Sequence, residues 1–228
     1  MTPLVLLPGL ACDEALWAPQ LTALSGAAKM QVGDTLQDDS LPAMAARVLA
    51  DAPDRFALAG LSMGGYLAFE ILRQAPERVE KLALLDTGAR PDTPEQAGKR
   101  ADTVAALDRI GMGGVMQAGL DTLLARGASS ELRRAVVAMG ERAGADAYRR
   151  QQRAIAARPD SRPLLPHIAV PTLVLVGEED ALTPPAVAKE MADAIPDATL
   201  VQVPGSGHLS TLERPDAVTA AMRDWLAR

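Results

Sequence analysis

Residues 60–65 combine a serine with three glycines in the pattern of a nucleophilic turn. The segment reads Gly60-Leu61-Ser62-Met63-Gly64-Gly65 and directly follows an apolar run. In a sharp strand-to-helix turn the serine hydroxyl is held out of the sheet, and glycine is needed where side chains would collide across the turn. The alternative is a glycine-rich turn that contains a serine by chance. Because a strand pattern precedes Ser62 and a helical pattern follows it, we predict that Ser62 is a catalytic nucleophile.

A serine hydroxyl is a weak nucleophile at neutral pH and needs an adjacent base. The chain has only two histidines, His167 and His208. His208 lies in a Pro-Gly-Ser-Gly-His loop after the last predicted strand, whereas His167 comes just before a predicted strand. Because active residues gather at the carboxyl ends of parallel strands, we predict that His208 is the base. His167 is then a structural residue.

A carboxylate is expected to orient the histidine and to stabilise its charged form. Glu178, Glu179 and Asp180 follow one strand end together. We favour Asp180 because it is the last acid before the chain turns into a helix, while the two glutamates fit a solvated loop. Asp86, at the end of another strand, is the alternative acid, and its other interpretation is a turn or cap residue.

Two backbone N–H groups are candidates for an oxyanion hole. Met63 follows the nucleophile at the start of a helix, where the helix dipole favours a developing negative charge. The Pro8-Gly9 turn after the first strand would bring the N–H of Leu10 to the same side, although such a turn often only joins a strand to a helix. Cys12, close by, is predicted to be a small packing residue.

Short apolar runs alternate with helical patterns along the chain, which predicts an α/β fold with a parallel sheet flanked by helices. Asp13 and Ser40 are expected to cap the first two helices. The predicted strands cover residues 3–7, 30–36, 55–61, 81–86, 172–176 and 199–203.

Residues 90–166 break this rhythm, because helical patterns punctuated by glycines replace the strands. We predict a helical lid of three to five helices here, inserted between two core segments, 1–89 and 167–228. A methionine and leucine stripe in this segment could line an aliphatic acyl pocket or simply pack; it comprises Met112, Met116, Leu120, Leu123 and Leu124. The segment is also rich in arginine, which is expected mostly on the surface, although a few arginines could attract an anionic substrate or carrier.

Composition and charge argue against several other classes of protein. A chain of 228 residues fits one ordinary domain, or one domain that carries a modest insertion, and with a net charge of −6 it lacks the basic stripe of a nucleic-acid-binding protein. A single cysteine excludes an internal disulfide, and two histidines argue against a histidine-based metal site. The apolar run at residues 4–7 is too short for a signal peptide or a membrane span. We therefore expect a cytoplasmic monomer or homodimer, without metal or organic cofactor.

The order serine, aspartate, histidine resembles that of the α/β-hydrolase superfamily. The segments that carry the resemblance span nearly the whole chain: residues 6–9, 60–65, 171–180 and 207–208. Within the superfamily the chain is similar to small bacterial carboxylesterases, including pimeloyl-carrier-protein methyl esterases and relatives that are enol-lactonases. One departure is the start of the chain, which lies almost on the Pro-Gly loop, whereas family members usually begin with an antiparallel strand pair.

This resemblance implies six parallel strands in the order 4-3-5-6-7-8 of the family numbering, with the helical insert as a lid. It also implies hydrolysis of a small carboxylic ester, free or linked to a carrier, through an acyl-enzyme. Two alternatives remain open with the same triad: a lactonase (or enol-lactonase) and an acyltransferase. A non-catalytic small-molecule receptor on the same fold is the alternative from another class.

Overall fold

Six apolar segments pair as one parallel sheet in the computed structural model, which describes residues 2–228. The sheet order is β2-β1-β3-β4-β5-β6, which confirms the order implied by the family resemblance. The strands are β1 (Thr2–Leu7), β2 (Ala28–Val32), β3 (Phe56–Leu61), β4 (Val79–Leu85), β5 (Thr172–Gly177) and β6 (Ala198–Val203).

The second strand is displaced from its predicted range of 30–36. It begins at Ala28 and ends at Val32, and only the N–H of Gly33 continues towards β1, donating to the carbonyl of Leu6 at 2.9 Å. Beyond that point Thr35 turns inward and is buried. The carbonyl of Thr35 accepts a hydrogen bond from the side chain of Gln151 in the helical insert, so Thr35 makes a tertiary contact in place of a strand contact.

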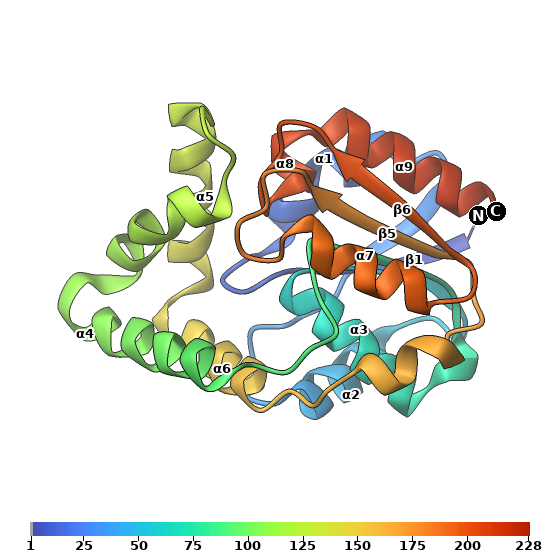
Figure 1. The fold of residues 1–228 in the computed structure, drawn as a ribbon, viewed down its shortest axis with the longest axis horizontal. Coiled ribbons are helices and arrows are strands. Elements are labelled where there is room, and N and C mark those ends of the chain that lie inside the picture. Colours follow the sequence, from blue (N-terminus) through green and yellow to red (C-terminus); the bar gives the residue numbers. More distant parts are fainter. Residues whose placement is uncertain (1) are drawn as a thin grey trace.

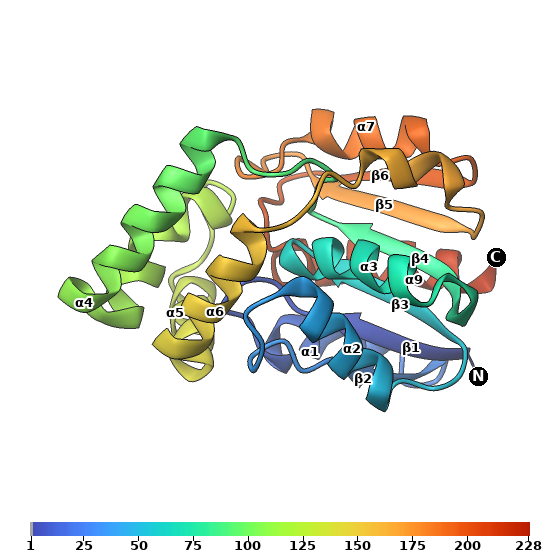
Figure 2. The same ribbon diagram turned by 90° about the horizontal axis from the view of Figure 1, so that it is seen from below.

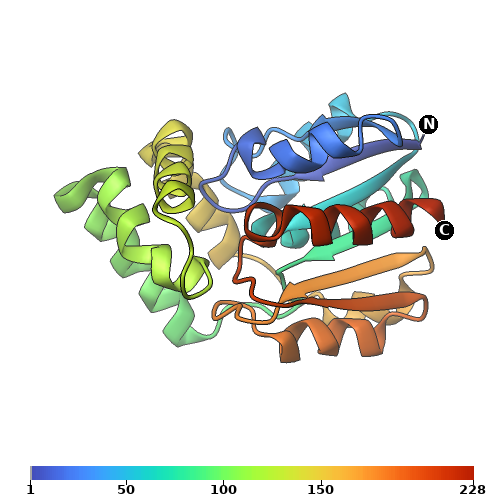
Figure 3. The same ribbon diagram turned by 90° about the horizontal axis from the view of Figure 1, so that it is seen from above.

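Helices cover both faces of the sheet, as the continuous burial of β3 and β5 requires. Successive residues of β1 point to opposite faces: Leu4 and Leu6 belong to one apolar core, and Val5 and Leu7 to the other. The first core is closed by α1 (Ala18–Ala23) and α9 (Pro215–Ala227). The second is closed by α2 (Leu41–Asp51), α3 (Met63–Gln74) and α7 (Pro185–Ala194), as Figures 2 and 3 show from opposite sides.

The remaining elements are short connections. They are the 3-10 turns η1 (Glu14–Trp17), η2 (Pro76–Arg78) and η3 (Arg162–His167), and the single-turn helix α8 (Ser210–Glu213). The predicted caps are present: the side chain of Asp13 accepts from the N–H of Ala15, and that of Ser40 from the N–H of Ala43.

Residues 90–166 form three helices beyond the carboxyl ends of the strands: α4 (Pro94–Leu123), α5 (Ser130–Ala143) and α6 (Ala145–Ala156). Figure 1 shows them at the end of the molecule remote from the start of β1 and the end of α9. Helix α4 is bent at Gly111, whose φ of +67° is readily adopted only by glycine. Within residues 2–228, no helix is both long and apolar enough to cross a membrane.

Candidate active site

Ser62 occupies the turn between β3 and α3 in a strained backbone conformation, with φ 56° and ψ −115°. The flanking glycines are required by close backbone contacts. A Cβ on Gly60 would lie 2.2 Å from the carbonyl oxygen of Gly64, and one on Gly64 would lie 2.1 Å from that of Leu7. Thr87 steadies the turn by donating its hydroxyl hydrogen to the carbonyl of Ser62 at 2.7 Å. Gly60 therefore fits the collision across the turn argued from the sequence, whereas Gly64 is required by the neighbouring strand β1.

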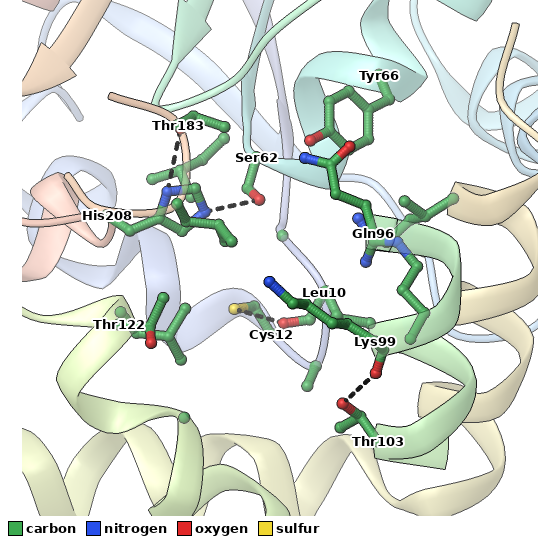
Figure 4. Close-up of a pocket in the computed structure, with 18 of the residues that line it drawn as sticks. Leu10, Cys12, Ser62, Tyr66, Gln96, Lys99, Thr103, Thr122, Thr183 and His208 are labelled. Carbon is green, nitrogen blue, oxygen red and sulfur yellow. Dashed lines mark hydrogen bonds between the residues drawn. The ribbon is translucent and has the colours of Figure 1, made fainter. Parts of the chain in front are cut away.

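Three predicted residues from separate loops come together here. The Oγ of Ser62 lies 2.8 Å from Nε2 of His208, and Nδ1 of His208 lies 2.8 Å from Oδ2 of Asp180. Figure 4 shows His208 reaching Ser62 at the wall of a pocket. All three side chains are buried or nearly so. With Nδ1 protonated towards the carboxylate, Nε2 can accept the hydrogen of the serine hydroxyl.

The environment of Asp180 favours its ionised form. Burial alone would raise the pKa of Asp180, but the charge and hydrogen bond of His208 lower it overall. The N–H groups of Leu182 and Thr183 donate to Oδ1 at 2.8 and 2.9 Å, and the hydroxyl of Thr183 donates to Oδ2 at 2.7 Å. For His208, burial lowers the pKa of the imidazole. The carboxylate of Asp180 outweighs the effect of burial, so the pKa of His208 is raised overall. The pair is therefore arranged to stabilise an imidazolium.

Asp86 lies in the bend directly after β4, in keeping with the turn interpretation from the sequence, and its side chain also makes long-range contacts. It has φ +45°, is fully buried, and accepts hydrogen bonds from the N–H of Gly177 at 2.9 Å and from the hydroxyl of Ser210. Burial raises the pKa of Asp86 to about 7. Because Ser210 lies two residues after His208, Asp86 links the ends of β4 and β5 to the histidine loop.

The loop after β1 holds the predicted oxyanion donor Leu10. None of the hydrogen bonds described for residues 2–228 uses the N–H of Leu10 or of Met63, and Leu10 lines the pocket while Met63 is buried. The next residue, Ala11, has φ +57° and donates its N–H to Oε1 of Gln151 at 2.9 Å. Gln151, on α6, donates from Nε2 to the carbonyl of Thr35 at 3.0 Å. The helical insert thus holds the loop that carries Leu10.

The histidine loop is also held by a half-buried acid, Glu213. Oε1 of Glu213 accepts from the N–H groups of Gly207 and Leu209, on either side of His208, at 3.0 and 3.2 Å. Its Oε2 accepts from the N–H of Ala125, just after α4, at 2.7 Å. The N–H of His208 itself donates to the carbonyl of Leu123 at 2.9 Å. The end of α4 and the histidine loop therefore form one hydrogen-bonded unit.

A cavity of about 620 Å³ opens over Ser62 and His208, between the sheet and helices α4–α6. Of the methionine and leucine stripe, Met116 and Leu123 line it, while Met112, Leu120 and Leu124 pack in the core. Cys12 also lines the cavity, with its thiol 3.3 Å from the carbonyl of Leu10. Burial raises the pKa of Cys12 to about 12, so this thiol is not an activated nucleophile.

The histidine and the two glutamates that were not predicted to be catalytic do not take part in the hydrogen bonds between Ser62, His208 and Asp180. His167 is exposed at the end of η3, before β5. Glu178 and Glu179 are exposed as well, and Glu179 accepts a backbone hydrogen bond from Arg126 at 3.2 Å. Among the described residues, no cluster of three His, Cys, Asp or Glu side chains could hold a metal ion.

Known proteins share this fold and resemble this sequence along most of its length. A family profile described as alpha/beta hydrolase fold matches residues 7–215. The chain belongs to the α/β-hydrolase family. The pimeloyl-[acyl-carrier protein] methyl ester esterase of Pectobacterium carotovorum is 29% identical over 96% of this chain and 91% of its own.

Two solved structures of α/β hydrolases superpose over the whole chain. A thermophilic esterase from Thermogutta terrifontis, solved with malate bound, is 32% identical with a TM-score of 0.91, and 90% of its chain is covered. The enol-lactonase from Burkholderia xenovorans LB400 is 28% identical with a TM-score of 0.86, and 92% of its chain is covered.

Sequence reasoning missed several residues that shape this α/β-hydrolase pocket. Thr183 follows the predicted acid by three residues, a spacing at which a threonine can bind back to an aspartate, so this contact could have been inferred. Gln151 and Glu213 gave no such signal, because a glutamine or glutamate on a helix normally faces solvent. Only their tertiary hydrogen bonds distinguish them, and of the two only Gln151 is fully buried.

Proposed function

We propose that this protein hydrolyses a carboxylic ester through an acyl-enzyme on Ser62. The observation that carries the proposal is the hydrogen-bonded chain from Ser62 through His208 to Asp180, at 2.8 Å for each contact, beside a cavity large enough for a small ester. A serine with a base in reach and an acid behind that base is the arrangement that activates a hydroxyl for attack on a carbonyl carbon.

The first half-reaction forms the acyl-enzyme. The Oγ of Ser62 attacks the ester carbonyl carbon while Nε2 of His208 takes the hydroxyl proton. The carbonyl oxygen gains the negative charge and accepts hydrogen bonds from the N–H groups of Leu10 and Met63. When the tetrahedral intermediate collapses, the bond to the alcohol oxygen breaks and His208 returns the proton to that leaving oxygen.

The second half-reaction frees the acid. His208 takes a proton from a water molecule, which attacks the acyl carbon, and the same two N–H groups receive the oxyanion. The bond from the acyl carbon to Oγ then breaks, and His208 returns the proton to Ser62. Asp180 holds the imidazole in the tautomer that both steps need and stabilises its charged form.

Lactone hydrolysis is a second candidate, because the same steps open a cyclic ester. The similarity to an enol-lactonase, with a TM-score of 0.86, supports lactones as candidate substrates. The esterase relatives favour an open-chain ester, and one of them is named for a carrier-linked one. A panel of p-nitrophenyl esters of increasing acyl length, run beside several lactones, separates the two.

The nucleophile is tested by labelling and mutation. A fluorophosphonate should modify one serine, identified by peptide mass as Ser62, and Ser62→Ala should lose a factor of about 10⁴ to 10⁶ in kcat. Because this hydroxyl borders a cavity, the melting temperature should hardly change. Ser25→Ala, on an exposed loop, serves as the matched control. Retention of a tenth of the activity in Ser62→Ala would refute the assignment.

The base is tested with the two histidines. His208→Ala should erase activity, whereas His167→Ala should keep most of it, because His167 is exposed at the end of η3 and does not line the cavity. The opposite pattern would refute His208 as the base. A protein that binds esters without turning any of them over would instead be a receptor on this fold.

A further inference from the structure

The charged side chains that line the cavity are all cationic. They are Arg90, Lys99, Arg100 and Arg158, and no aspartate or glutamate is among the described residues of its wall. A cleft lined by charges of one sign attracts a ligand of the opposite sign. Whether any of these cations can bind a ligand depends on how far each is already neutralised by the protein.

Two of the four are paired at the rim of the cavity. Arg90 forms an ion pair with Glu190 at 2.7 Å and is 61% exposed. Lys99 forms one with Glu95 at 2.7 Å and is 74% exposed. Exposed pairs of this kind are weak and solvent-screened. Arg90 and Lys99 can steer an anion towards the cavity, but they do not make a defined site.

The other two share one carboxylate. Asp92 lies 2.6 Å from Nε of Arg100 and 2.7 Å from Nη1 of Arg158. Burial would raise the pKa of Asp92, but the two guanidinium groups outweigh burial and lower it, so the carboxylate is ionised. Two guanidinium charges against one carboxylate leave one positive charge uncompensated. The Asp92 side chain is 3% exposed and that of Arg158 is 7% exposed, so this excess is largely removed from water.

Arg158 has donor capacity left over. Its Nε donates to the carbonyl of Arg90 and its Nη1 to that of Ile155, each at 3.0 Å. None of the hydrogen bonds or ion pairs described for residues 2–228 uses its Nη2. Among the described residues, Nη2 of Arg158 is not one of the fully buried polar atoms that lack a partner, so it keeps accessible surface, and Arg158 lines the cavity. A ligand in the cavity could accept a hydrogen bond from this Nη2.

Tyr66 connects the excess charge to the turn that carries the nucleophile. The guanidinium of Arg158 stacks 4.3 Å from the centroid of the Tyr66 ring. Tyr66 is one helical turn after Ser62, and its N–H donates to the carbonyl of Ser62. Figure 4 shows Ser62 with His208 on one side and with Tyr66 and Gln96 on the other. The position of Arg158 is therefore tied to the side of the cavity opposite the base.

We propose that the ester substrate carries a second group that is a carboxylate, and that Arg158, supported by Arg100 and Tyr66, binds this carboxylate beside Ser62. The inference rests on the proposed ester hydrolysis and names its substrate class, half-esters of dicarboxylic acids. A planar guanidinium matches a carboxylate with two parallel donors. The bound carboxylate would bring the two arginines and Asp92 to electrical balance.

Binding of the product class tests the carboxylate site without catalysis. Calorimetry would measure dicarboxylates from succinate to suberate, and their neutral diamides, on the wild type, Arg158→Gln and Arg162→Gln. Arg162 is exposed, pairs with Asp160 and does not line the cavity, so it is the matched control. We expect at least one dicarboxylate to bind the wild type and the control, and to bind Arg158→Gln about 10- to 100-fold more weakly. If no dicarboxylate binds better than its diamide, the proposal is overturned.

Arg158→Lys guards against a failure of Arg158→Gln to fold. It keeps the charge beside Asp92 but loses the planar pair of donors, so dicarboxylate affinity should fall several-fold while the melting temperature stays near that of the wild type. Unchanged affinity in both variants would overturn the assignment of Arg158.

Hydrolysis separates this inference from the proposed function. The kcat/KM of each monomethyl half-ester would be divided by that of the neutral methyl ester of the same chain length. We expect a ratio well above one in the wild type and Arg162→Gln, and a loss of the preference in Arg158→Gln. Equal hydrolysis of both ester types would overturn the inference and leave ester hydrolysis standing. Dicarboxylate binding without hydrolysis of any ester would overturn ester hydrolysis, and with it the assignment of half-esters as substrates.

Discussion

Oδ2 of Asp180 lies 2.8 Å from Nδ1 of His208, although the chain offers a second buried acid nearby. Asp86 is bound instead to Gly177 and Ser210. The difference follows from the sheet order, because β5, which leads to Asp180, is the direct neighbour of β6, which leads to His208. The strand that leads to Asp86 is one position further away.

The two acids should therefore differ in catalysis. Asp180→Asn should lower kcat by about 10⁴, because the imidazole then favours the wrong tautomer. Asp86→Asn should keep a substantial rate, because an amide oxygen can still accept from Gly177. Steady-state kinetics on a short p-nitrophenyl ester would measure both. Equal loss in the two variants would mean that Asp86 is part of the catalytic group.

The pH dependence of kcat/KM should report His208. The base acts as a neutral imidazole, so activity should rise as pH rises through its pKa. Because Asp180 raises that pKa overall, the midpoint should lie above the ordinary histidine value of about 6.5. In the residual activity of Asp180→Asn the midpoint should move to lower pH, since the neighbouring negative charge is gone. A midpoint unmoved by this variant would contradict the coupling.

Asp86 should make stability depend on pH. Its pKa is raised to about 7 in the folded protein, against about 3.9 in an unfolded chain. Between these values the folded state binds more protons than the unfolded state, so the contribution of Asp86 to stability is full below about pH 4 and is lost as pH rises towards 7. Urea unfolding across this range should show the loss in the wild type and a smaller loss in Asp86→Asn. Parallel profiles would contradict the raised pKa.

Gln151 should act as a positioning residue for the oxyanion loop. Gln151→Leu removes the acceptor for the N–H of Ala11, and a small displacement of the adjacent Leu10 N–H can lower kcat by up to about 100-fold. KM should change much less, because the donor acts mainly on the charge that develops in the transition state. Gln74→Leu, on an exposed face of α3, is the control. A change confined to melting temperature would assign Gln151 a purely structural role.

The thiol of Cys12 should be unreactive towards alkylating reagents although Cys12 lines the cavity. With a pKa of about 12, very little thiolate exists near neutral pH, and thiolate is the reactive form. After treatment with iodoacetamide at pH 7.5, mass spectrometry should find Cys12 unmodified, and the rate of p-nitrophenyl ester hydrolysis expected from the proposed function should be unchanged. Rapid modification that abolishes activity would show that the thiol is more accessible than its burial indicates.

The sequence alone determined the features that depend on local chain geometry. The turn at Ser62 follows from three glycines and an apolar strand, and a Cβ on Gly60 would indeed collide within the turn itself. Gly64 and Gly65 are required by Leu7 at the end of β1 and by Thr87 after β4, which only the tertiary structure brings there. The alternating apolar runs predicted a parallel sheet, its strand order followed from the family resemblance alone, and the loop positions of His208 and Asp180 followed from the rule that parallel strands present their carboxyl ends at one edge.

Tertiary structure decided the residues that act from a distance. Asp86 meets Ser210, Gln151 meets Ala11, and Arg158 shares Asp92 with Arg100, in each case through a polar side chain with many feasible partners. A charged or amide side chain on a helix carries no periodic signal that separates a buried contact from a solvated one. Its environment is set by how the helical insert packs over the sheet, and the free energy of burying that polar group depends on partners that are distant in the chain.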